Sequence, residues 1–339
     1  MRVDLRSDTI TKPTTAMRAF MMQAEVGDDV FGEDITINLL EEKIATILGA
    51  EAALFCPTAT MCNQIAIKIL TSPLDEIIAD KLSHIYNYEV GGYAFNSGVS
   101  IRLVEGDWGR ISPQQITDNI NPADVHKPIT SLVCLENTCN KGGGSIYRLP
   151  HLQEIKTVCD ANNLKLHLDG SRLFNALVET KDDTTQYGKI FDTITICLSK
   201  GLGCPVGALL VGKKQYISKA ERVRKVFGGG MRQAGIIAAA GIYALDNHIE
   251  QLRTDHAHAR EIAGVLQMMH YIEKILPVES NIIIFTLKPE YDADHFITYL
   301  TAHDIHAFAI GENAIRFVTH LDVYDEMVEK VKKVIPEFV

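Results

Sequence analysis

Two apolar runs that end in charged residues decide the fold: residues 164–172 have the sequence LKLHLDGSR, and residues 194–203 have the sequence ITICLSKGLG. Each run has the length of one buried strand and is followed by glycine, which permits a turn. Amphipathic stretches with the spacing of helices, such as Pro150–Asn162, lie between such runs. Continuous apolar strands that alternate with helices predict an α/β domain with a mostly parallel sheet buried on both faces.

The pattern changes along the chain. Helical periodicity extends from about Lys213 to Leu266, with an interruption at residues 228–230. We therefore expect a large domain with an N-terminal arm over residues 1–250 and a smaller α+β domain over residues 251–339. The strands expected in the large domain are Ala52–Phe55, Ile77–Ala79, Ile101–Val104, Leu132–Leu135, Leu164–Leu168, Ile194–Leu198 and Ala208–Val211. In the small domain we expect strands at Ile282–Thr286 and Ala314–Val318 and helices at His295–His303 and Val323–Val334.

Composition excludes several classes of function. The 339 residues carry a formal net charge of −10 without a long basic run, which argues against a nucleic-acid or anionic-membrane partner. The first residues lack the apolar core of a signal peptide, and the most apolar segment, Ala234–Leu245, is shorter than the roughly 20 residues that span a bilayer. Seven cysteines without a CxxC pair are typical of reduced thiols. We expect a cytoplasmic protein.

No metal site is expected. His256 and His258 are two residues apart on an expected helix, so they point to different faces and are a poor pair of ligands. We interpret them as surface histidines.

The chemistry of the chain is indicated by Asp169 and Lys200. Ligands of open α/β sheets collect at the carboxyl ends of strands, and both residues occupy such ends. Pyridoxal phosphate (PLP) requires a lysine for its Schiff base and an acid that keeps its pyridine nitrogen protonated. Taken alone, Asp169 is equally a turn or helix-capping residue, and Lys200 a solvated lysine. Together they favour a PLP site.

Two further segments are candidate anion sites. Thr58, Ala59 and Thr60 follow a strand and open a helix, where backbone N–H groups and the helix dipole favour a phosphate. An ordinary threonine cap explains the same residues. The three glycines at residues 228–230, followed by Arg232, allow close approach of a ligand or another subunit, or form a hinge.

Arginine and histidine residues complete the candidate site. Arg172 and Arg316 are candidates for a substrate carboxylate, which a guanidinium binds through two parallel hydrogen bonds. Because an arginine within an apolar strand is costly unless paired, Arg316 is the more informative, and a structural ion pair is its alternative. His84 follows a strand and is a candidate to stack on the cofactor or to act as a base, or else a hydrogen-bonded loop histidine.

Several motifs in the same order resemble the low-specificity L-threonine aldolases. They are residues 5–9 (LRSDT), 26–32 (VGDDVFG), 168–172 (LDGSR), 198–202 (LSKGL), 228–233 (GGGMRQ) and 319–322 (THLD), so the resemblance covers essentially the whole chain. It implies the PLP-dependent fold type I, which is the aspartate-aminotransferase fold, within the β-eliminating lyase group. It also implies a homotetramer.

The resemblance implies a role for each matching residue. Lys200 would form the Schiff base, Asp169 would pair with the pyridinium nitrogen, and His84 would stack on the ring. The phosphate cradle would be formed by Thr58, Ala59 and Thr60. The substrate carboxylate would be bound by Ser7, Arg172 and Arg316. Lys225 and Arg232 would contribute to the site of a neighbouring subunit.

One residue departs from the family pattern. Many members have histidine in the motif Glu-Asn-Thr-His-Asn, near the substrate β-hydroxyl, whereas residues 136–140 here read ENTCN. The thiol of Cys139 is a weak hydrogen-bond donor, so recognition of the hydroxyl, and with it the preference between threo and erythro substrates, is expected to differ.

The expected reaction is retro-aldol cleavage of L-threonine or L-allo-threonine to glycine and acetaldehyde, with His84 as the candidate base. Another PLP reaction on a small amino acid, such as β-elimination, hydroxymethyl transfer or racemisation, is the first alternative. A catalytically silent homologue is the second, and the joint presence of Lys200 and Asp169 argues against it.

Overall fold

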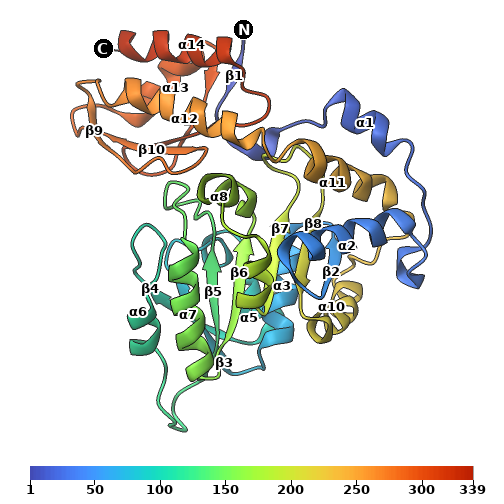
Figure 1. Ribbon diagram of the computed structural model, residues 1–339. Coiled ribbons are helices and arrows are strands. Elements are labelled where there is room, and N and C mark those ends of the chain that lie inside the picture. The colour runs from blue at the N-terminus through green and yellow to red at the C-terminus, as the bar shows by residue number, and fades with distance from the viewer. Residues whose placement is uncertain (339) are drawn as a thin grey trace.

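The computed structural model describes residues 1–338 and places them in two layered units joined by helices and by the N-terminal arm (Figure 1). The central sheet of the large unit has seven strands in the order β2-β8-β7-β6-β5-β3-β4. They are β2 (Ala52–Cys56), β3 (Asp75–Asp80), β4 (Ser100–Val104), β5 (Ile129–Glu136), β6 (Lys165–Gly170), β7 (Thr193–Cys197) and β8 (Ala208–Gly212). Only β8 runs against its two neighbours, so the predicted mostly parallel sheet is confirmed.

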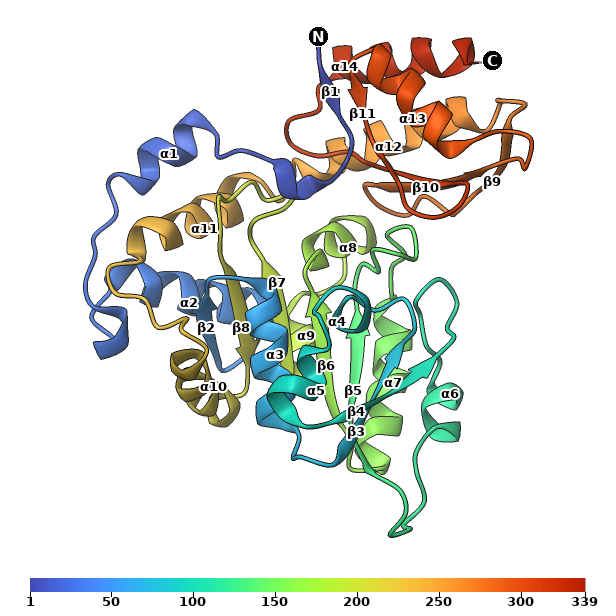
Figure 2. The same ribbon diagram turned by 180° about the vertical axis from the view of Figure 1, so that it is seen from behind.

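Both faces of this sheet are covered because successive residues of a strand point to opposite sides. Leu166 and Leu168 of β6 belong to one core cluster, while Leu54 of β2 and Leu210 of β8 belong to another. On the first face lie α2 (Ile35–Leu48), α6 (Pro113–Asp118), α7 (Leu149–Ala161), α8 (Leu173–Thr180), α9 (Thr185–Ile190) and α11 (Gly235–Asn247). On the second lie α3 (Ala59–Leu70), α5 (Gly92–Ser97) and α10 (Lys214–Val226), which Figure 2 shows in front of the sheet.

The small unit is an antiparallel sheet with helices on one side. Its strands, in the order β12-β13-β10-β9, are β9 (Ile272–Ile275), β10 (Ile282–Leu287), β12 (Phe308–Ala309) and β13 (Ala314–Val318). The helices α12 (Leu252–Leu266), α13 (Ala293–Ala302) and α14 (Asp325–Val334) and the short η3 (Ile335–Glu337) pack on it. The expected α+β character of this region is confirmed. Between the two units, α11 ends at Asn247 and α12 begins at Leu252.

The N-terminal arm crosses between the two units. Its first strand, β1 (Val3–Asp4), pairs in parallel with β11 (Ile305–His306), and Val3 and Leu5 are buried in the core of the small unit. The arm continues through η1 (Asp8–Ile10), packs α1 (Thr15–Met21) on α11, and reaches η2 (Asp29–Phe31) beside α2 (Figure 1). Residues assigned from sequence to the large domain therefore contribute to the core of the small one.

The interpretation of His256 and His258 as surface histidines is wrong. Both are buried on α12, which packs against α8 on one side and α14 on the other. His256 contacts Asn175 Oδ1 at 2.9 Å, and His258 contacts Asp325 Oδ1 at 2.8 Å. Because two different neighbours cover the helix, side chains on different faces are both buried and bind separate partners.

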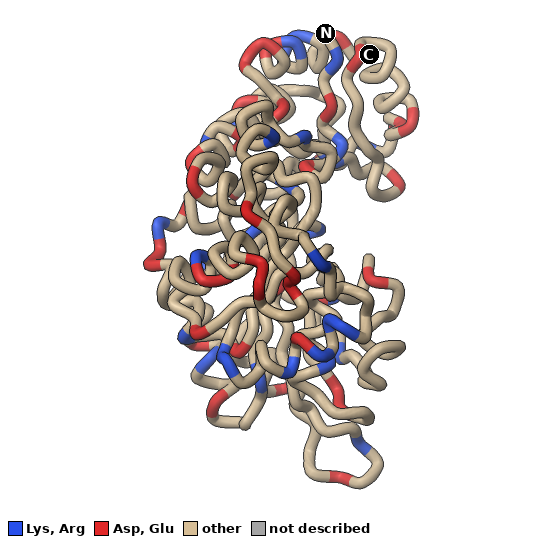
Figure 3. The backbone as a smooth tube through the Cα atoms, turned by 90° about the vertical axis from the view of Figure 1, so that its right-hand side faces the viewer, with Lys and Arg blue, Asp and Glu red and all other residues tan. Residues whose placement is uncertain are grey.

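Charges are dispersed over the fold. Figure 3 shows Lys and Arg positions interspersed with Asp and Glu along the tube rather than gathered on one element. Within residues 1–338, no helix is long and apolar enough to cross a membrane.

Candidate functional site

Asp169 and Lys200 meet at the carboxyl edge of the large sheet. Asp169 is the penultimate residue of β6, and Lys200 comes three residues after the neighbouring parallel strand β7. The Asp169 carboxylate is buried and accepts hydrogen bonds from Asn63 Nδ2 at 2.8 Å and from the Ser171 N–H at 3.1 Å. Burial alone would raise the pKa of Asp169, but the positive charges of His84 and Lys200 lower it. The carboxylate is therefore ionised, as pairing with a protonated ring nitrogen requires.

His84 lies beside this carboxylate at the start of α4 (His84–Asn87). Its backbone N–H donates to Glu136 Oε2 at 2.8 Å, and its Nδ1 is 2.9 Å from Glu89 Oε1. Burial alone would lower the pKa of His84, but the hydrogen bond to Glu89 and the charge of Asp169 raise it. The imidazole therefore keeps its proton to a higher pH than a free histidine does.

Asn63 connects the two carboxylates of this region. Its Nδ2 donates to Glu89 Oε1 at 2.9 Å as well as to Asp169. Ligand atoms of His84, Glu89 and Asp169 lie within 4.8 Å of one another, a spacing that one cation could span. The amide hydrogens of Asn63 already lie between the carboxylates, so we interpret the group as a hydrogen-bonded network rather than a metal centre.

A cavity of about 390 Å³ opens above Lys200. It brings together Ser7, His84, Arg172, Lys200 and Arg316, all predicted from sequence to be site residues. The N-terminal arm, the large sheet edge and the small unit each supply part of its wall. The remaining lining residues are Thr9, Tyr88, Asn140, Phe308, Ala309 and Ile310.

The two arginines of the cavity are held differently. Arg172 is bound to Asp8 through two hydrogen bonds of 2.7 Å, from Nε to Oδ2 and from Nη2 to Oδ1. Arg316 has only uncharged partners, because Nη1 donates to Asn140 Oδ1 at 2.9 Å and Nη2 to the Arg6 carbonyl at 3.0 Å. Within the described part of the chain, Arg316 Nε is buried and has no acceptor. A guanidinium that lines a cavity and has only uncharged partners keeps a positive charge that suits a carboxylate ligand.

The expected phosphate cradle lies at the amino end of α3. Thr58 is the N-cap, and its side chain accepts a hydrogen bond from the Met61 N–H at 3.1 Å. The capping role and the cradle role are compatible, because the first turn of a helix has further N–H groups without intrahelical acceptors. Ala59 is the first helical residue, so its methyl group requires no left-handed backbone. The segment at Thr58, Ala59 and Thr60 fits a phosphate group.

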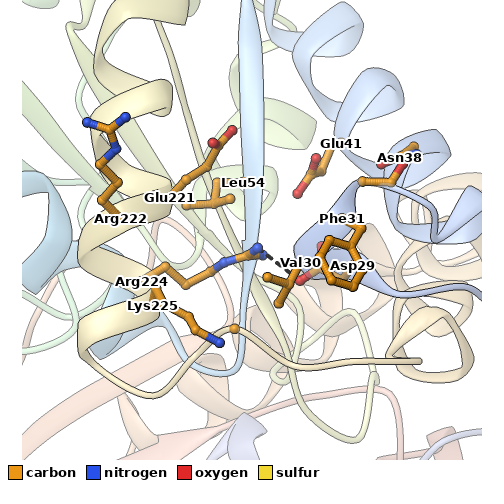
Figure 4. Close-up of a pocket in the computed structure, with 12 residues that line it drawn as sticks. Asp29, Val30, Phe31, Asn38, Glu41, Leu54, Glu221, Arg222, Arg224 and Lys225 are labelled. Carbon is orange, nitrogen blue, oxygen red and sulfur yellow. Dashed lines mark hydrogen bonds and ion pairs between the residues drawn. The ribbon is translucent and has the colours of Figure 1, made fainter.

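Lys225 and Arg232 lie elsewhere, at a second cavity of about 470 Å³ (Figure 4). Lys225 lines it, whereas Arg232 does not and forms a 2.8 Å ion pair with Asp28, the residue before the lining residue Asp29. Figure 4 shows Arg224 at its centre, where the guanidinium forms a 2.9 Å ion pair with Asp29. Within one chain, Lys225 and Arg232 are therefore not brought to the cavity above Lys200.

A half-buried acid borders the second cavity. Glu41 Oε1 accepts a 2.7 Å hydrogen bond from the Phe55 N–H, and burial raises the pKa of Glu41 to about 7. Side chains next to this cavity are apolar and exposed: Phe31, which lines it, is 74% exposed, and Val226, which follows Lys225, is 82% exposed.

Cys139 does not reach the cavity above Lys200. Its side chain is buried, and its Sγ packs against Gly109, where even an added Cβ would come within 2.2 Å of the sulfur. Burial raises the pKa of the Cys139 thiol well above its usual range. The neighbouring Asn140, not Cys139, lines the cavity.

Sequence reasoning did not identify Asp8, Asn63, Glu89 and Asn140 as site residues. Asp8 directly follows Ser7, and Asn140 directly follows Cys139. Because Ser7 and Cys139 were candidate site residues, their positions in the sequence could have pointed to Asp8 and Asn140. Glu89 and Asn63 have no such signal, because their contacts to His84 and Asp169 depend on the packing of α3 and α4.

The chain is similar over most of its length to proteins of one family. The family model described as beta-eliminating lyase matches residues 4–288. A low specificity L-threonine aldolase of Escherichia coli strain K12 is 39% identical over 97% of each chain. The corresponding protein of Saccharomyces cerevisiae is 36% identical over 98% of this chain and 86% of its own length.

A structure of a Leishmania major threonine aldolase has a TM-score of 0.86 with 20% identity and covers 99% of both chains. At this identity the likeness establishes the fold, which is PLP fold type I. By the sequence relationships, the chain belongs to the beta-eliminating lyase family and, within it, to the low-specificity L-threonine aldolases, which are PLP-dependent lyases.

Proposed function

We propose that this protein uses PLP to cleave L-threonine or L-allo-threonine, or another β-hydroxy-α-amino acid, into glycine and an aldehyde, acetaldehyde in the case of threonine. The single observation that carries the proposal is the cavity at the sheet edge, which combines the Lys200 amine with two arginines beside the buried carboxylate of Asp169. An amine, an ionised acid and a carboxylate site are the groups that an amino-acid substrate and PLP together require.

The chain provides a partner for each end of the cofactor. Lys200 would bind the aldehyde carbon, Asp169 would pair with the ring nitrogen, and the amino end of α3 at Thr58 would hold the phosphate. His84 lies beside Asp169 and would stack on the cofactor ring. When bound, PLP supplies an electron sink that stabilises the negative charge left at Cα after the Cα–Cβ bond breaks.

Ser7, Arg172 and Arg316 bind the substrate carboxylate. Arg316 offers a guanidinium without a charged partner, and Arg172 lines the same cavity beside Lys200. If the carboxylate is held at one end and the amino group near Lys200 at the other, rotation about the bond between the amino nitrogen and Cα is restricted. Which bond of Cα breaks depends on this restriction.

His84 acts as the base that removes the β-hydroxyl proton, directly or through a water molecule. A base must be neutral before it accepts a proton, and the raised pKa of His84 means that it becomes neutral only above its ordinary range. Glu89 fixes the orientation of the His84 imidazole through the 2.9 Å contact between Oε1 and Nδ1.

The active protein is a homotetramer in which Lys225 and Arg232 contribute to a neighbouring subunit's site. Two observations support this: the two residues lie away from their own Lys200 cavity, and exposed apolar side chains surround them. Roles in threonine breakdown and glycine formation, and a cytoplasmic location, belong to the same proposal.

The deciding experiment measures aldehyde release from the four stereoisomers of threonine by the PLP-loaded protein. We expect release from at least one L-isomer, together with equimolar glycine. Parallel product analysis with serine and alanine distinguishes the alternatives: pyruvate from serine, or racemised alanine, in the absence of aldehyde would contradict the proposal.

A further inference from the structure

Asp8 occupies a buried position at the junction of the two units. Its side chain is fully buried, and both oxygens accept from Arg172 at 2.7 Å. Burial alone would raise the pKa of Asp8, but the Arg172 guanidinium holds it well below its usual range. The pair is therefore ionic, with the two parallel hydrogen bonds that fix a guanidinium most firmly.

This pairing leaves one edge of Arg172 for a ligand. Nε and Nη2 are both taken by Asp8, and no residue among 1–338 accepts a hydrogen bond from Nη1. Arg172 lines the cavity together with Ser7 and Lys200. The free Nη1 is thus the part of Arg172 that remains to meet a substrate carboxylate.

Asp8 is itself held in place by three parts of the chain. Its carbonyl accepts from Thr11 Oγ1 at 3.0 Å, and the same hydroxyl lies 2.8 Å from the Lys200 carbonyl. Asn281, next to β10 in the small unit, approaches Asp8 Oδ2 at 3.4 Å. The carboxylate is therefore fixed relative to Lys200 and not only relative to Arg172.

Apart from the Lys200 amine of the same cavity, the charges of Arg172, Arg316 and Asp8 sum to a single positive charge. Arg172 and Arg316 contribute two, and Asp8 contributes one negative charge. The hydrogen-bond partners of Arg316, Asn140 and the Arg6 carbonyl, are uncharged. One uncompensated cation fits one carboxylate, and without Asp8 two like charges would repel each other in a buried space.

We propose that Asp8 is a positioning residue for recognition of the substrate carboxylate: it orients Arg172 and balances one of the two guanidinium charges without touching the substrate. The inference rests on the proposed function, because it assigns Arg172 and Arg316 to the carboxylate of an amino acid.

The experiment compares two ligands of the PLP-loaded protein that differ in the carboxylate. Glycine and ethanolamine share a primary amine, and both are titrated against the absorbance of the bound cofactor, with no need for turnover. In Asp8→Asn we expect the Kd of glycine to rise about tenfold or more, the loss typical of a charge-assisted hydrogen bond. The Kd of ethanolamine is expected to stay within about twofold.

Asp192→Asn is the matched control. Asp192 is also buried and paired, with Lys213 Nζ at 3.0 Å, but it lies at the start of β7, away from the cavity. Its variant is expected to leave the ratio of the two Kd values unchanged. Equal losses for glycine and ethanolamine in Asp8→Asn, or a loss for neither, would overturn the proposal.

Two further variants keep the proposal testable if Asp8→Asn fails to fold. Asp8→Glu keeps the charge but displaces Arg172, and we expect the same selective loss for glycine, smaller in size. In Arg172→Ala, adding Asp8→Asn is expected to weaken glycine binding no further, because the two act as a unit. An additive second loss would mean that Asp8 acts elsewhere. Absence of threonine cleavage would count against the proposed function but not against this binding result.

Discussion

The cavity at Lys200 and the cavity at Lys225 both gather arginines and carboxylates, but they differ in what they leave unpaired. At Lys200, Arg316 lines the cavity and has only uncharged partners, so a positive charge is available to a small ligand. At Lys225, Arg224 is paired with Asp29, and exposed apolar side chains stand next to the paired charges. The first environment suits a carboxylate, whereas the second suits a protein surface.

Removing the Lys200 amine from the first cavity should have the largest effect on activity. In Lys200→Ala we expect the absorbance of the bound cofactor to lose its Schiff-base band and threonine cleavage to fall by about 10³-fold or more, because the covalent attachment is lost. Lys219→Ala, an exposed lysine of α10, is the control and should behave like wild type. A Lys200→Ala protein with a wild-type spectrum would refute the assignment.

Removing the base should leave the cofactor in place but slow the reaction. In His84→Asn we expect kcat to fall by about 100-fold, the usual contribution of a general base. Because the pKa of His84 is raised, the wild-type kcat/KM should increase with pH through a pKa above about 6.5, and the variant should lack this step. Full turnover with an unchanged pH profile would remove His84 from the mechanism.

The second cavity is tested by mixing variants. If Lys225 serves a neighbouring subunit, Lys225→Ala should lower kcat/KM about tenfold by loss of one charged contact. Co-expression with Lys200→Ala should then restore activity, because mixed assemblies contain one site with both residues intact. A mixture with only the mean activity of its two components would show that Lys225 acts within its own chain or not at all.

The difference between the cavities was only partly predictable from sequence. Asp169 and Lys200 end apolar runs, and because strand ends are local features, their meeting at one sheet edge followed from the α/β pattern. The partners of the two arginines could not be foreseen: Asp8 is 164 residues from Arg172 along the chain, and Asn140 is 176 from Arg316. Such pairs depend on how the units pack.

The same reason explains the errors of detail. The burial of His256 and His258 follows from α12 lying between α8 and α14, which no periodicity within α12 reveals. Likewise, the pairing of β1 with β11 joins residues about 300 positions apart, as the contact of Val3 with Ile305 shows. Local sequence patterns predicted the helices and strands, whereas contacts between residues far apart in the sequence determine which helices and strands lie next to each other.

Each cavity has an acid near it, and the ionisation of that acid changes the free energy of unfolding. Near the first cavity, the carboxyl group of Asp255 is buried, and burial together with the charge of Asp8 raises the pKa of Asp255 to about 8 against the opposing effect of Gln251. The unfolded chain releases this proton near pH 4, so stability falls as pH rises from about 4 to 8 and then changes no further.

Asp255→Asn cannot ionise and should therefore be more stable than wild type at pH 8, on the order of 2 kcal/mol, with the gain much smaller at pH 5. Urea unfolding at the two pH values measures it. Near the second cavity, Glu41→Gln should gain less, because the Glu41 carboxylate has the Phe55 N–H as a partner. An equal gain at both pH values would show that Asp255 is not protonated in the folded protein.

The smallest effect is expected at Cys139, which differs from the family motif but lies outside both cavities. Because its Sγ is buried against Gly109, Cys139→Ser should change the threonine to allo-threonine ratio of kcat/KM by less than about twofold. Cys139→His has no room in the same direction, so its imidazole either lowers the Tm or turns toward the cavity. A changed ratio in the serine variant would place the thiol near the substrate hydroxyl. A changed ratio in the histidine variant alone would show that only a longer side chain from this position reaches the first cavity.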